Sequence, residues 1–423
     1  MGMTLVEKIF ARHAGKAHVR PGQILTVEVD YCMANDGTMR LNSSIIEEKL
    51  KLHRVWDPKK IVIVMDHQVP ADTPQAAEVH GISKAFSKKF GIDAFHDSDG
   101  ICHQVLLEKY ILPGQLVVGA DSHTLSAGAI GASGLGMGST DISAVMAGGT
   151  TWIRVPETVR VRLHGTLQNG VCPKDIILAL IKTTTASGLN YKAVEFTGDA
   201  LAALSAPDRF TLCNMTAEAG AKTSLIAPDE GIYGYLESLR KTSIDRVDWL
   251  YTDEDAQYSQ TIHMDLDALE PQVACPHSVD NVHPVSAVAG KKVDQIFLGS
   301  CTNGRYEDLA IAGRILKGRK IHPETRFLVT PASRQVYLKA MREGLIETFM
   351  NAGAVINHPS CSTCWGAGQG VVAPGQTLLS TQSRNYKGRS GSLDAMIYLA
   401  SPFTVAVSAL NGVITDPRGF HAN

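Results

Sequence analysis

The sequence predicts an α/β protein of several domains, each built on a sheet with helices around it. The chain has 423 residues, which is enough for about two to four domains with a sizeable hydrophobic core. The continuous apolar run over residues 61–65 is typical of a strand buried on both faces. Residues 73–90, which follow it, have the pattern of a helix.

Composition excludes several classes of protein. The charge balance is almost neutral, with 40 basic and 42 acidic side chains, so nothing indicates nucleic acid or an anionic membrane as a partner. The N-terminus lacks the apolar stretch of a signal peptide, and no apolar run is long enough to span a bilayer. We therefore expect a cytoplasmic protein, whose eight cysteines serve as thiols, metal ligands or catalytic groups and not as disulfides.

The first expected domain covers residues 1–155 and contains strands that end in polar residues. The predicted elements are a helix over residues 4–12, strands over 24–30, 61–65 and 115–119, a polar turn over 31–38 and a helix over 73–90. Asp66 and His67 follow the second of these strands, and Asp121, Ser122 and His123 follow the third. Ligands bind beyond the carboxyl ends of strands in open α/β sheets, so these residues are candidates for a site.

Residues 128–149 are rich in glycine and suggest a nucleotide-binding loop. The run Gly134-Leu135-Gly136-Met137-Gly138 lacks the G-x-G-x-x-G spacing, and no acidic residue ends a following strand at the required distance. We expect instead the close packing of a glycine-faced helix, or a loop whose backbone amides approach a ligand.

Two further domains are expected, over residues 156–287 and 288–423. In the second domain, residues 159–163 alternate like a strand and residues 174–184 have the pattern of a helix. Residues 252–285 are polar and acidic and contain proline, which is typical of a crossing between domains. The third domain is an α/β unit that starts near Val293.

Three cysteines of the third domain carry the chemistry. Cys301 follows an apolar run, and Cys361 and Cys364 form a C-x-x-C pair. Three thiolates suit an iron–sulfur cluster with one iron left open, whereas a closed structural zinc site, the alternative, needs a fourth ligand. We expect the remaining cysteines to be buried as small hydrophobic residues; they are Cys32, Cys102, Cys172, Cys213 and Cys275.

Histidines beside carboxylates are candidates for proton transfer. A carboxylate raises the pKa of a neighbouring imidazole and fixes its tautomer, and this pairing occurs at 66–67 and at 121–123. His103 is a third candidate, and a buried structural histidine is the alternative for each. A Ser-His-Asp hydrolase at 121–123 is disfavoured, because adjacent residues rarely point at each other and no G-x-S-x-G motif is present.

The remaining polar candidates complete one kind of reaction. Arg384 and Arg389 could bind the carboxylates of a di- or tricarboxylate, or form a solvated surface pair. Glu218 could be a general base, a hydrogen-bond partner for an iron-bound hydroxide or an exposed helix residue, and Asn214 could donate to a cluster sulfide. A Lewis-acidic iron, an imidazole acid, a base and two arginines together indicate the reversible dehydration of a hydroxy acid.

These motifs resemble those of the aconitase superfamily, specifically the separate large subunits of the 3-isopropylmalate dehydratase and homoaconitase group. The resemblance runs over essentially the whole chain, in the family's order. The matching segments are Asp66-His67, Gly100-Ile101-Cys102-His103-Gln104, Gly119-Ala120-Asp121-Ser122-His123-Thr124, Cys213-Asn214-Met215 with Glu218, Gly299-Ser300-Cys301-Thr302-Asn303, Cys361-x-x-Cys364 and Arg384-Asn385-Tyr386-x-Gly388-Arg389.

The resemblance implies three α/β/α domains packed around one [4Fe-4S] cluster per chain, held by Cys301, Cys361 and Cys364 with one iron free of cysteine. It assigns acid–base and water-positioning roles to Asp66, His67, His103, Asp121, His123 and Glu218. It places Asn35, Ser122, Arg384 and Arg389 at the substrate, and Asn214, Asn303 and Ser383 around the cluster. Two positions depart from the family pattern, which has asparagine in place of Ser383 and Gln, Glu or His in place of Asn35.

The resemblance also implies a partner. Single-chain aconitases carry a fourth, swivelling domain with the serine that removes the carbon-bound proton, and we expect a separate small subunit of this type, in a heterodimer or heterotetramer. The expected reaction is that of 3-isopropylmalate dehydratase in leucine biosynthesis, with homoaconitate hydratase or a methyl- or dimethylmalate dehydratase as alternatives. An iron-responsive RNA-binding protein is a distant alternative, disfavoured by the neutral charge.

Overall fold

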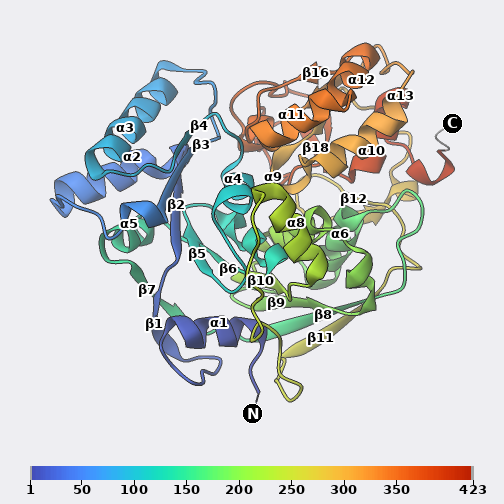
Figure 1. Ribbon diagram of the computed structural model, residues 1–423. Helices are drawn as coiled ribbons and strands as arrows, with labels where there is room; N and C mark the ends of the chain where they lie inside the picture. Colours follow the sequence, from blue (N-terminus) through green and yellow to red (C-terminus); the bar gives the residue numbers. More distant parts are fainter. Residues whose placement is uncertain (1, 421–423) are drawn as a thin grey trace.

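The computed structural model describes residues 2–420, whose strands form four sheets. Figure 1 shows the first part of the chain (blue) and the last part (orange) on either side of the molecule, with the middle part (green) below and between them. Most strand pairs are parallel, and helices lie around the sheets, so the predicted α/β class is confirmed. Among residues 2–420, no helix combines the length and apolar character needed to cross a bilayer.

Residues 2–154 contain a five-stranded parallel sheet in the order β4-β3-β2-β5-β6 and a short antiparallel pair of β1 with β7. All five residues of β3 are buried, as expected for a strand covered on both faces. The strands are β1 (Ile24–Glu28), β2 (Tyr31–Asn35), β3 (Ile61–Met65), β4 (Phe95–Asp97), β5 (Leu116–Gly119), β6 (Ser133–Gly136) and β7 (Thr150–Arg154), and the helices are α1 (Leu5–His13), α2 (Asp36–Ser44), α3 (Pro74–Phe90), α4 (Cys102–Lys109) and α5 (Ser139–Gly148).

The polar turn expected over residues 31–38 is wrong, because residues 31–35 form β2, the middle strand of this sheet. Cys32, Met33 and Ala34 are fully buried between β3 and β5. The polar residues at both ends of this short run conceal its apolar centre in the sequence. Asp36, assigned to the turn, therefore lies directly beyond a strand end.

The glycine-rich region packs closely against its neighbours, as predicted. A Cβ atom on Gly134 in β6 would lie 2.0 Å from the carbonyl oxygen of Thr124. A Cβ atom on Gly128, in the 3-10 helix over Ser122–Ile130, would lie 1.6 Å from the carbonyl oxygen of Ser224. Close approach of two backbones therefore requires glycine at both positions.

The middle of the chain forms a four-stranded parallel sheet in the order β10-β9-β8-β11. The expected crossing over residues 252–285 is only partly a connection, because β11 pairs with β8 along its whole length. The strands are β8 (Thr158–His164), β9 (Ala193–Thr197), β10 (Thr223–Ile226) and β11 (Gln260–Asp265), and the helices are α6 (Pro173–Thr184), α7 (Ala206–Met215) and α8 (Glu230–Arg240).

The last part forms a seven-stranded sheet in the order β13-β12-β18-β17-β14-β15-β16, parallel from β18 to β16. The strands are β12 (Gln272–Ala274), β13 (Val282–Pro284), β14 (Gln295–Leu298), β15 (Arg326–Val329), β16 (Val355–Ile356), β17 (Thr377–Ser380) and β18 (Met396–Leu399). The helices are α9 (Ser300–Asn303), α10 (Tyr306–Leu316), α11 (Arg334–Arg342), α12 (Leu345–Ala352) and α13 (Pro402–Asn411).

We propose that these sheets mark three domains, over residues 1–155, 156–287 and 288–423, with β12 and β13 of the middle range added to the sheet of the last. The three parts share one apolar core, which includes Met33, Phe210 and Phe297. The first and last parts also meet directly, since the Ile101 amide donates to the Ala332 carbonyl at 2.8 Å. Shared burial of this kind fixes the strand ends relative to one another.

Candidate active site

Three thiols from the last part of the chain line one buried cavity. Cys301 lies in α9, directly after β14, while Cys361 and Cys364 lie in the loop after β16. All three side chains are buried and none forms a disulfide. The Ser300 hydroxyl lies 3.4 Å from the Cys364 sulfur and 3.8 Å from the Cys301 sulfur, which brings these two thiols together.

The backbone next to two of these cysteines is strained. Ser300, before Cys301, has φ of 73°, and Ser362, after Cys361, has φ of 51°. Residues with a side chain rarely occupy this left-handed region, and such strain persists where the surroundings fix it, most often at functional sites.

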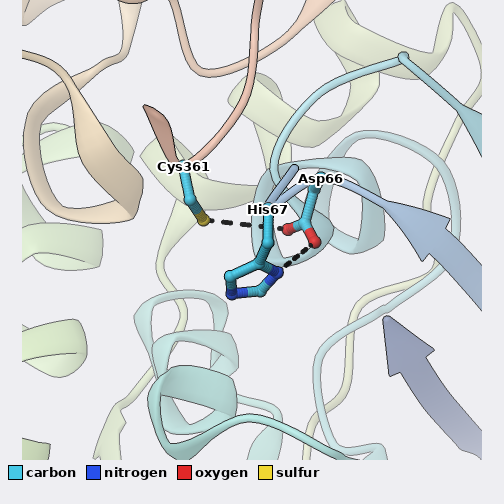
Figure 2. Close-up of side chains that lie close together, drawn as sticks. All are labelled: Asp66, His67 and Cys361. Carbon is cyan, nitrogen blue, oxygen red and sulfur yellow. Dashed lines mark hydrogen bonds and ion pairs between the residues drawn. The ribbon is translucent and has the colours of Figure 1, made fainter. Parts of the chain in front are cut away.

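Asp66 and His67 extend from β3 toward the same cavity. The Nδ1 atom of His67 lies 2.8 Å from Oδ1 of Asp66 (Figure 2). The second oxygen of Asp66 lies 4.0 Å from the Cys361 sulfur, and the Cys361 amide donates to the Asp66 carbonyl at 2.8 Å. With Nδ1 held in this way, Nε2 of His67 is the nitrogen left for a reacting group, and it lies 3.9 Å from Asp121.

Asp121 connects the other two histidines. Its Oδ1 atom lies 2.9 Å from Nε2 of His103 and accepts the backbone amide of His123 at 2.7 Å. Nδ1 of His103 is buried and has no hydrogen-bond partner among the described residues. All three predicted histidines therefore meet at one carboxylate.

Glu218 comes from the middle of the chain and joins His123 to Arg384. Its Oε1 atom lies 2.7 Å from Nε2 of His123, and both its oxygens accept Nε of Arg384, at 2.9 and 3.0 Å. Arg384 also donates to the Ser122 hydroxyl at 2.8 Å, whereas that hydroxyl lies 3.5 Å from His123. The serine is thus bonded to a guanidinium and poorly placed for activation as a hydrolase nucleophile.

The remaining predicted residues fall into two groups. Ser383 and Arg389 line the cavity, and Arg389 lies 3.8 Å from the Cys364 sulfur. The Oδ1 atom of Asn214 lies 3.8 Å from the Cys301 sulfur. Asn303 instead donates to Asp308, and Asn35 is the last residue of β2, beside Thr38; neither is among the described residues that line the cavity.

The charges of the site support one another. Burial alone would raise the pKa of Asp121, but His103 and His123 hold it well below its ordinary value. Burial would likewise raise the pKa of Glu218, and His123 and Arg384 lower it. Burial opposes a charge on His123, yet Cys301, Asp121 and Glu218 raise its pKa to about 10. Buried groups of opposite charge thus keep each other ionised.

The donor set fits an iron–sulfur cluster. Three free thiols face one cavity. Arg389 and Ser300 outweigh burial to lower the pKa of Cys364, which favours the thiolate that binds metal, whereas burial raises the pKa of the Cys361 thiol. The buried hydroxyl of Ser383, at the same cavity, has no partner among the described residues. Such an unpaired polar atom is what a bound group with acceptor atoms would satisfy.

Sequence reasoning missed three residues here. Asp36 accepts the backbone amides of Asp66, His67 and Gln68 and lies 3.2 Å from Nδ1 of His67; identifying β2 would have placed it at a strand end. Cys102 is buried as expected but also lines the cavity. Trp365, which directly follows Cys364, stacks edge-on against His67 with 4.7 Å between ring centroids.

Three thiols, three imidazoles and the guanidinium of Arg389 line one cavity of this α/β fold, a set of groups that suits a metal-dependent lyase. The family model for the aconitase family (aconitate hydratase) matches residues 7–292 and 286–412. The chain belongs to the aconitase family, which confirms the resemblance seen in the motifs, and it is a hydro-lyase of this family.

Relatives match over nearly their whole length. The chain is 45% identical to a probable methanogen homoaconitase large subunit of Methanothermobacter thermautotrophicus, covering 98% of each chain. It is 47% identical to a probable 3-isopropylmalate dehydratase large subunit of the same organism (99% of each) and 45% identical to a 3-isopropylmalate dehydratase large subunit of Methanopyrus kandleri (99% of this chain, 100% of that one).

A solved structure shares the fold. The crystal structure of Thermococcus kodakaraensis aconitase X in its holo-form is 12% identical, with a TM-score of 0.50, over 86% of this chain and 84% of that one. At this identity the likeness concerns the fold alone.

Proposed function

We propose that this chain is the large subunit of an iron–sulfur 3-isopropylmalate dehydratase, which interconverts 2- and 3-isopropylmalate. The observation that carries the proposal is the cavity itself, where Cys301, Cys361 and Cys364 meet His67, His103 and His123. Relatives named as large subunits of this dehydratase, similar over at least 98% of their length, support it.

Cys301, Cys361 and Cys364 would hold a [4Fe-4S] cluster, one per chain, with Asn214 and Ser383 beside it. When bound, the cluster supplies a Lewis-acidic iron without a cysteine ligand, which polarises a substrate hydroxyl. Asn303, which donates to Asp308, would support the helical turn α9 that carries Cys301.

The histidines would carry the protons of the reaction. Asp66 and Asp36 beside Nδ1 of His67 favour the imidazolium, which holds its second proton at Nε2 and can give it to a departing hydroxyl oxygen. Asp121 holds Nε2 of His103 and leaves Nδ1 free to bind water. Glu218 holds His123 and keeps its ring oriented.

The two arginines would bind the substrate's carboxylates. Arg389 lies at the cavity beside Cys364, and Arg384, oriented by Glu218, reaches the Ser122 hydroxyl. Isopropylmalate has two carboxylates, which two guanidinium groups can bind. Asn35, beside Asp36 at the end of β2, would contact the substrate from the first sheet.

Homoaconitate hydratase is the second candidate, since a relative named as a probable methanogen homoaconitase large subunit is 45% identical. Its substrate carries a third carboxylate, which would need a cation from outside the two arginines. We propose a small subunit of the swivel type as partner, in a heterodimer or heterotetramer, because the relatives are named as large subunits. That subunit would supply the base for the carbon-bound proton.

The test is anaerobic reconstitution of the chain with iron and sulfide, followed by turnover with a co-expressed small subunit. We expect about four irons and four sulfides per chain, and turnover of isopropylmalate faster than that of homoaconitate. Cys301→Ser should abolish both cluster uptake and turnover. Cys275→Ser, at a half-buried thiol outside the cavity, should leave cluster uptake and turnover unchanged.

Each outcome separates a part of the proposal. A protein that binds zinc and contains no sulfide would overturn both the proposed cluster and the mechanism that depends on it. A complete cluster with preference for homoaconitate would select the second candidate. Full turnover without a small subunit would mean that the base lies on this chain.

A further inference from the structure

Arg305 is the largest fully buried side chain among the described residues, with 1% of its surface exposed. Arginine is rarely buried, because removing its charge from water is costly unless partners replace the water. Arg305 follows α9, the single helical turn that carries Cys301. Its position raises the question of what this buried charge holds in place.

The guanidinium of Arg305 donates hydrogen bonds to the backbone of the cysteine turn, which is the single helical turn Ser300–Asn303. Nη1 donates to the Cys301 carbonyl at 2.9 Å, and Nη2 donates to the Thr302 carbonyl. The carbonyls at the end of a helix have no partner within the helix and carry a partial negative charge. A cation at this end therefore both satisfies and fixes the turn.

The same guanidinium ties the turn to α7. Nη2 donates to the Thr211 hydroxyl at 2.7 Å, and the guanidinium lies over the Phe210 ring, 4.7 Å from its centroid. The Thr211 hydroxyl in turn donates to the Thr302 carbonyl at 2.9 Å. Helix α7 thus contacts the turn through a chain of buried hydrogen bonds.

Helix α7 also contacts Cys301 directly. Its residue Asn214 has Oδ1 3.8 Å from the Cys301 sulfur, so α7 and the arginine both contact the residue that carries this thiol. The turn needs such support, because Ser300 has the strained φ of 73° described above. Asp308, with its Oδ2 3.7 Å from Nη2, balances the buried charge.

We propose that Arg305 is a positioning residue for Cys301: it fixes the carbonyl end of the cysteine turn against α7 and so keeps this sulfur directed into the cavity. The proposal rests on the proposed function only in that Cys301 is taken as a cluster ligand. Residues that orient metal ligands typically change metal affinity by about 10- to 100-fold when they are lost.

The chain offers a matched control in Arg209. This arginine is also buried, at 2% exposed, and donates to the Leu204 carbonyl at 3.1 Å, the Leu201 carbonyl at 2.9 Å and Asp229. It lies on α7 but bonds to no residue of the cysteine turn. Arg209→Gln therefore reports the cost of losing a buried arginine from this region, and Arg305→Gln reports that cost plus any effect on Cys301.

Two measurements test the proposal. The first is the rate at which a chelator removes iron from the reconstituted protein. The second is the rate at which iodoacetamide modifies each cysteine of the cluster-free chain, resolved by mass spectrometry. For Arg305→Gln we expect both iron loss and Cys301 modification to be about tenfold faster, with Cys361 and Cys364 modified at the wild-type rate. Arg209→Gln should match wild type in both.

Arg305→Lys keeps the charge but not the two-pronged donor geometry, so it should fall between wild type and Arg305→Gln, and it carries the test if Arg305→Gln does not fold. Wild-type rates in a folded Arg305 variant, or equal acceleration of all three cysteines or in Arg209→Gln, would overturn the proposal. A wild-type chain that takes up no cluster would contradict the proposed function instead, and the cysteine modification rates would still decide the role of Arg305.

Discussion

The imidazole of His123 and the carboxylate of Glu218 lie 2.7 Å apart (Nε2 to Oε1), although 95 residues separate them in the sequence. Both side chains are buried. The same carboxylate accepts Nε of Arg384 from the last sheet, so one group orients an imidazole and a guanidinium that come from different parts of the chain. Shortening or neutralising this carboxylate should therefore affect both proton transfer and substrate binding.

Glu218→Gln should lower kcat by about 100-fold, because His123 loses the charge that fixes its ring and its proton. The KM for the hydroxy acid should rise by about tenfold, because Arg384 keeps only a neutral partner on that side. Steady-state kinetics with the small subunit present, together with iron and sulfide content, would measure both. Glu230→Gln, at an exposed pair with Arg246, should change neither value, and unchanged kcat in Glu218→Gln would contradict the role assigned to Glu218.

Asp36→Asn should weaken the whole Asp66-His67 turn. The two Asp36 oxygens together accept three successive backbone amides, those of Asp66, His67 and Gln68, and an asparagine has only one acceptor oxygen to offer. Leaving a buried amide without a partner should lower the free energy of unfolding by about 2–4 kcal/mol, measured by urea denaturation of the cluster-free chain. Asp57→Asn, at an exposed cap of a short 3-10 helix, should cost less than about 1 kcal/mol. Equal costs for both variants would mean that Asp36 does not anchor this turn.

The fold and the site could be predicted wherever neighbouring residues carry the signal. Residues 61–65 are all apolar and form a strand, and Asp66 and His67, which contact each other, are adjacent in the sequence. Strand β2 could not be predicted in this way, because it is short and its polar ends resemble a turn. The position of Asp36 at a strand end therefore could not be predicted either.

The contacts between distant residues could not be predicted from the residues alone. The hydrogen bond between His103 and Asp121 depends on how α4 packs against the 3-10 helix that follows Asp121. The hydrogen bond between His123 and Glu218 depends on how the first sheet packs on the second. Strand order sets both, and strand order is not encoded in any local pattern. Arg305 illustrates the same limit, since burial of a charge appears only once α7 lies behind the cysteine turn.

Gly128→Ala and Gly148→Ala should change the free energy of unfolding in opposite directions. Gly128→Ala would place a methyl group 1.6 Å from the Ser224 carbonyl oxygen, so the two backbones must separate, at a cost of about 3 kcal/mol or more. Gly148→Ala, at the exposed end of α5, meets no atom within 4 Å and should stabilise the chain by about 0.5–1 kcal/mol through helix propensity. Urea denaturation compares them, and a tolerated Gly128→Ala would contradict the close packing described here.

The pair formed by His13 and Asp30 should make stability depend on pH. Nε2 of His13 lies 2.7 Å from Oδ2 of Asp30, at the junction of α1 with the β1–β2 connection. Burial opposes the charge on His13, but Asp30 outweighs it and raises the pKa of His13 above its ordinary value of 6.5. Burial would raise the pKa of Asp30, and His13 together with the Leu116 amide lowers it below its ordinary value of 3.8.

The two pKa shifts define the pH range in which the pair stabilises the fold. The contribution of His13 is fully present below pH 6.5 and is lost as the pH rises through its raised pKa, while that of Asp30 is present above pH 3.8 and is lost as the pH falls through its lowered pKa. His13→Gln keeps a polar side chain but cannot be charged, so it should cost about 1–2 kcal/mol near pH 5.5 and progressively less toward pH 9. Urea denaturation of the cluster-free chain across this range measures the difference. A cost that does not change with pH would show that the pair contributes by packing and not by its charges.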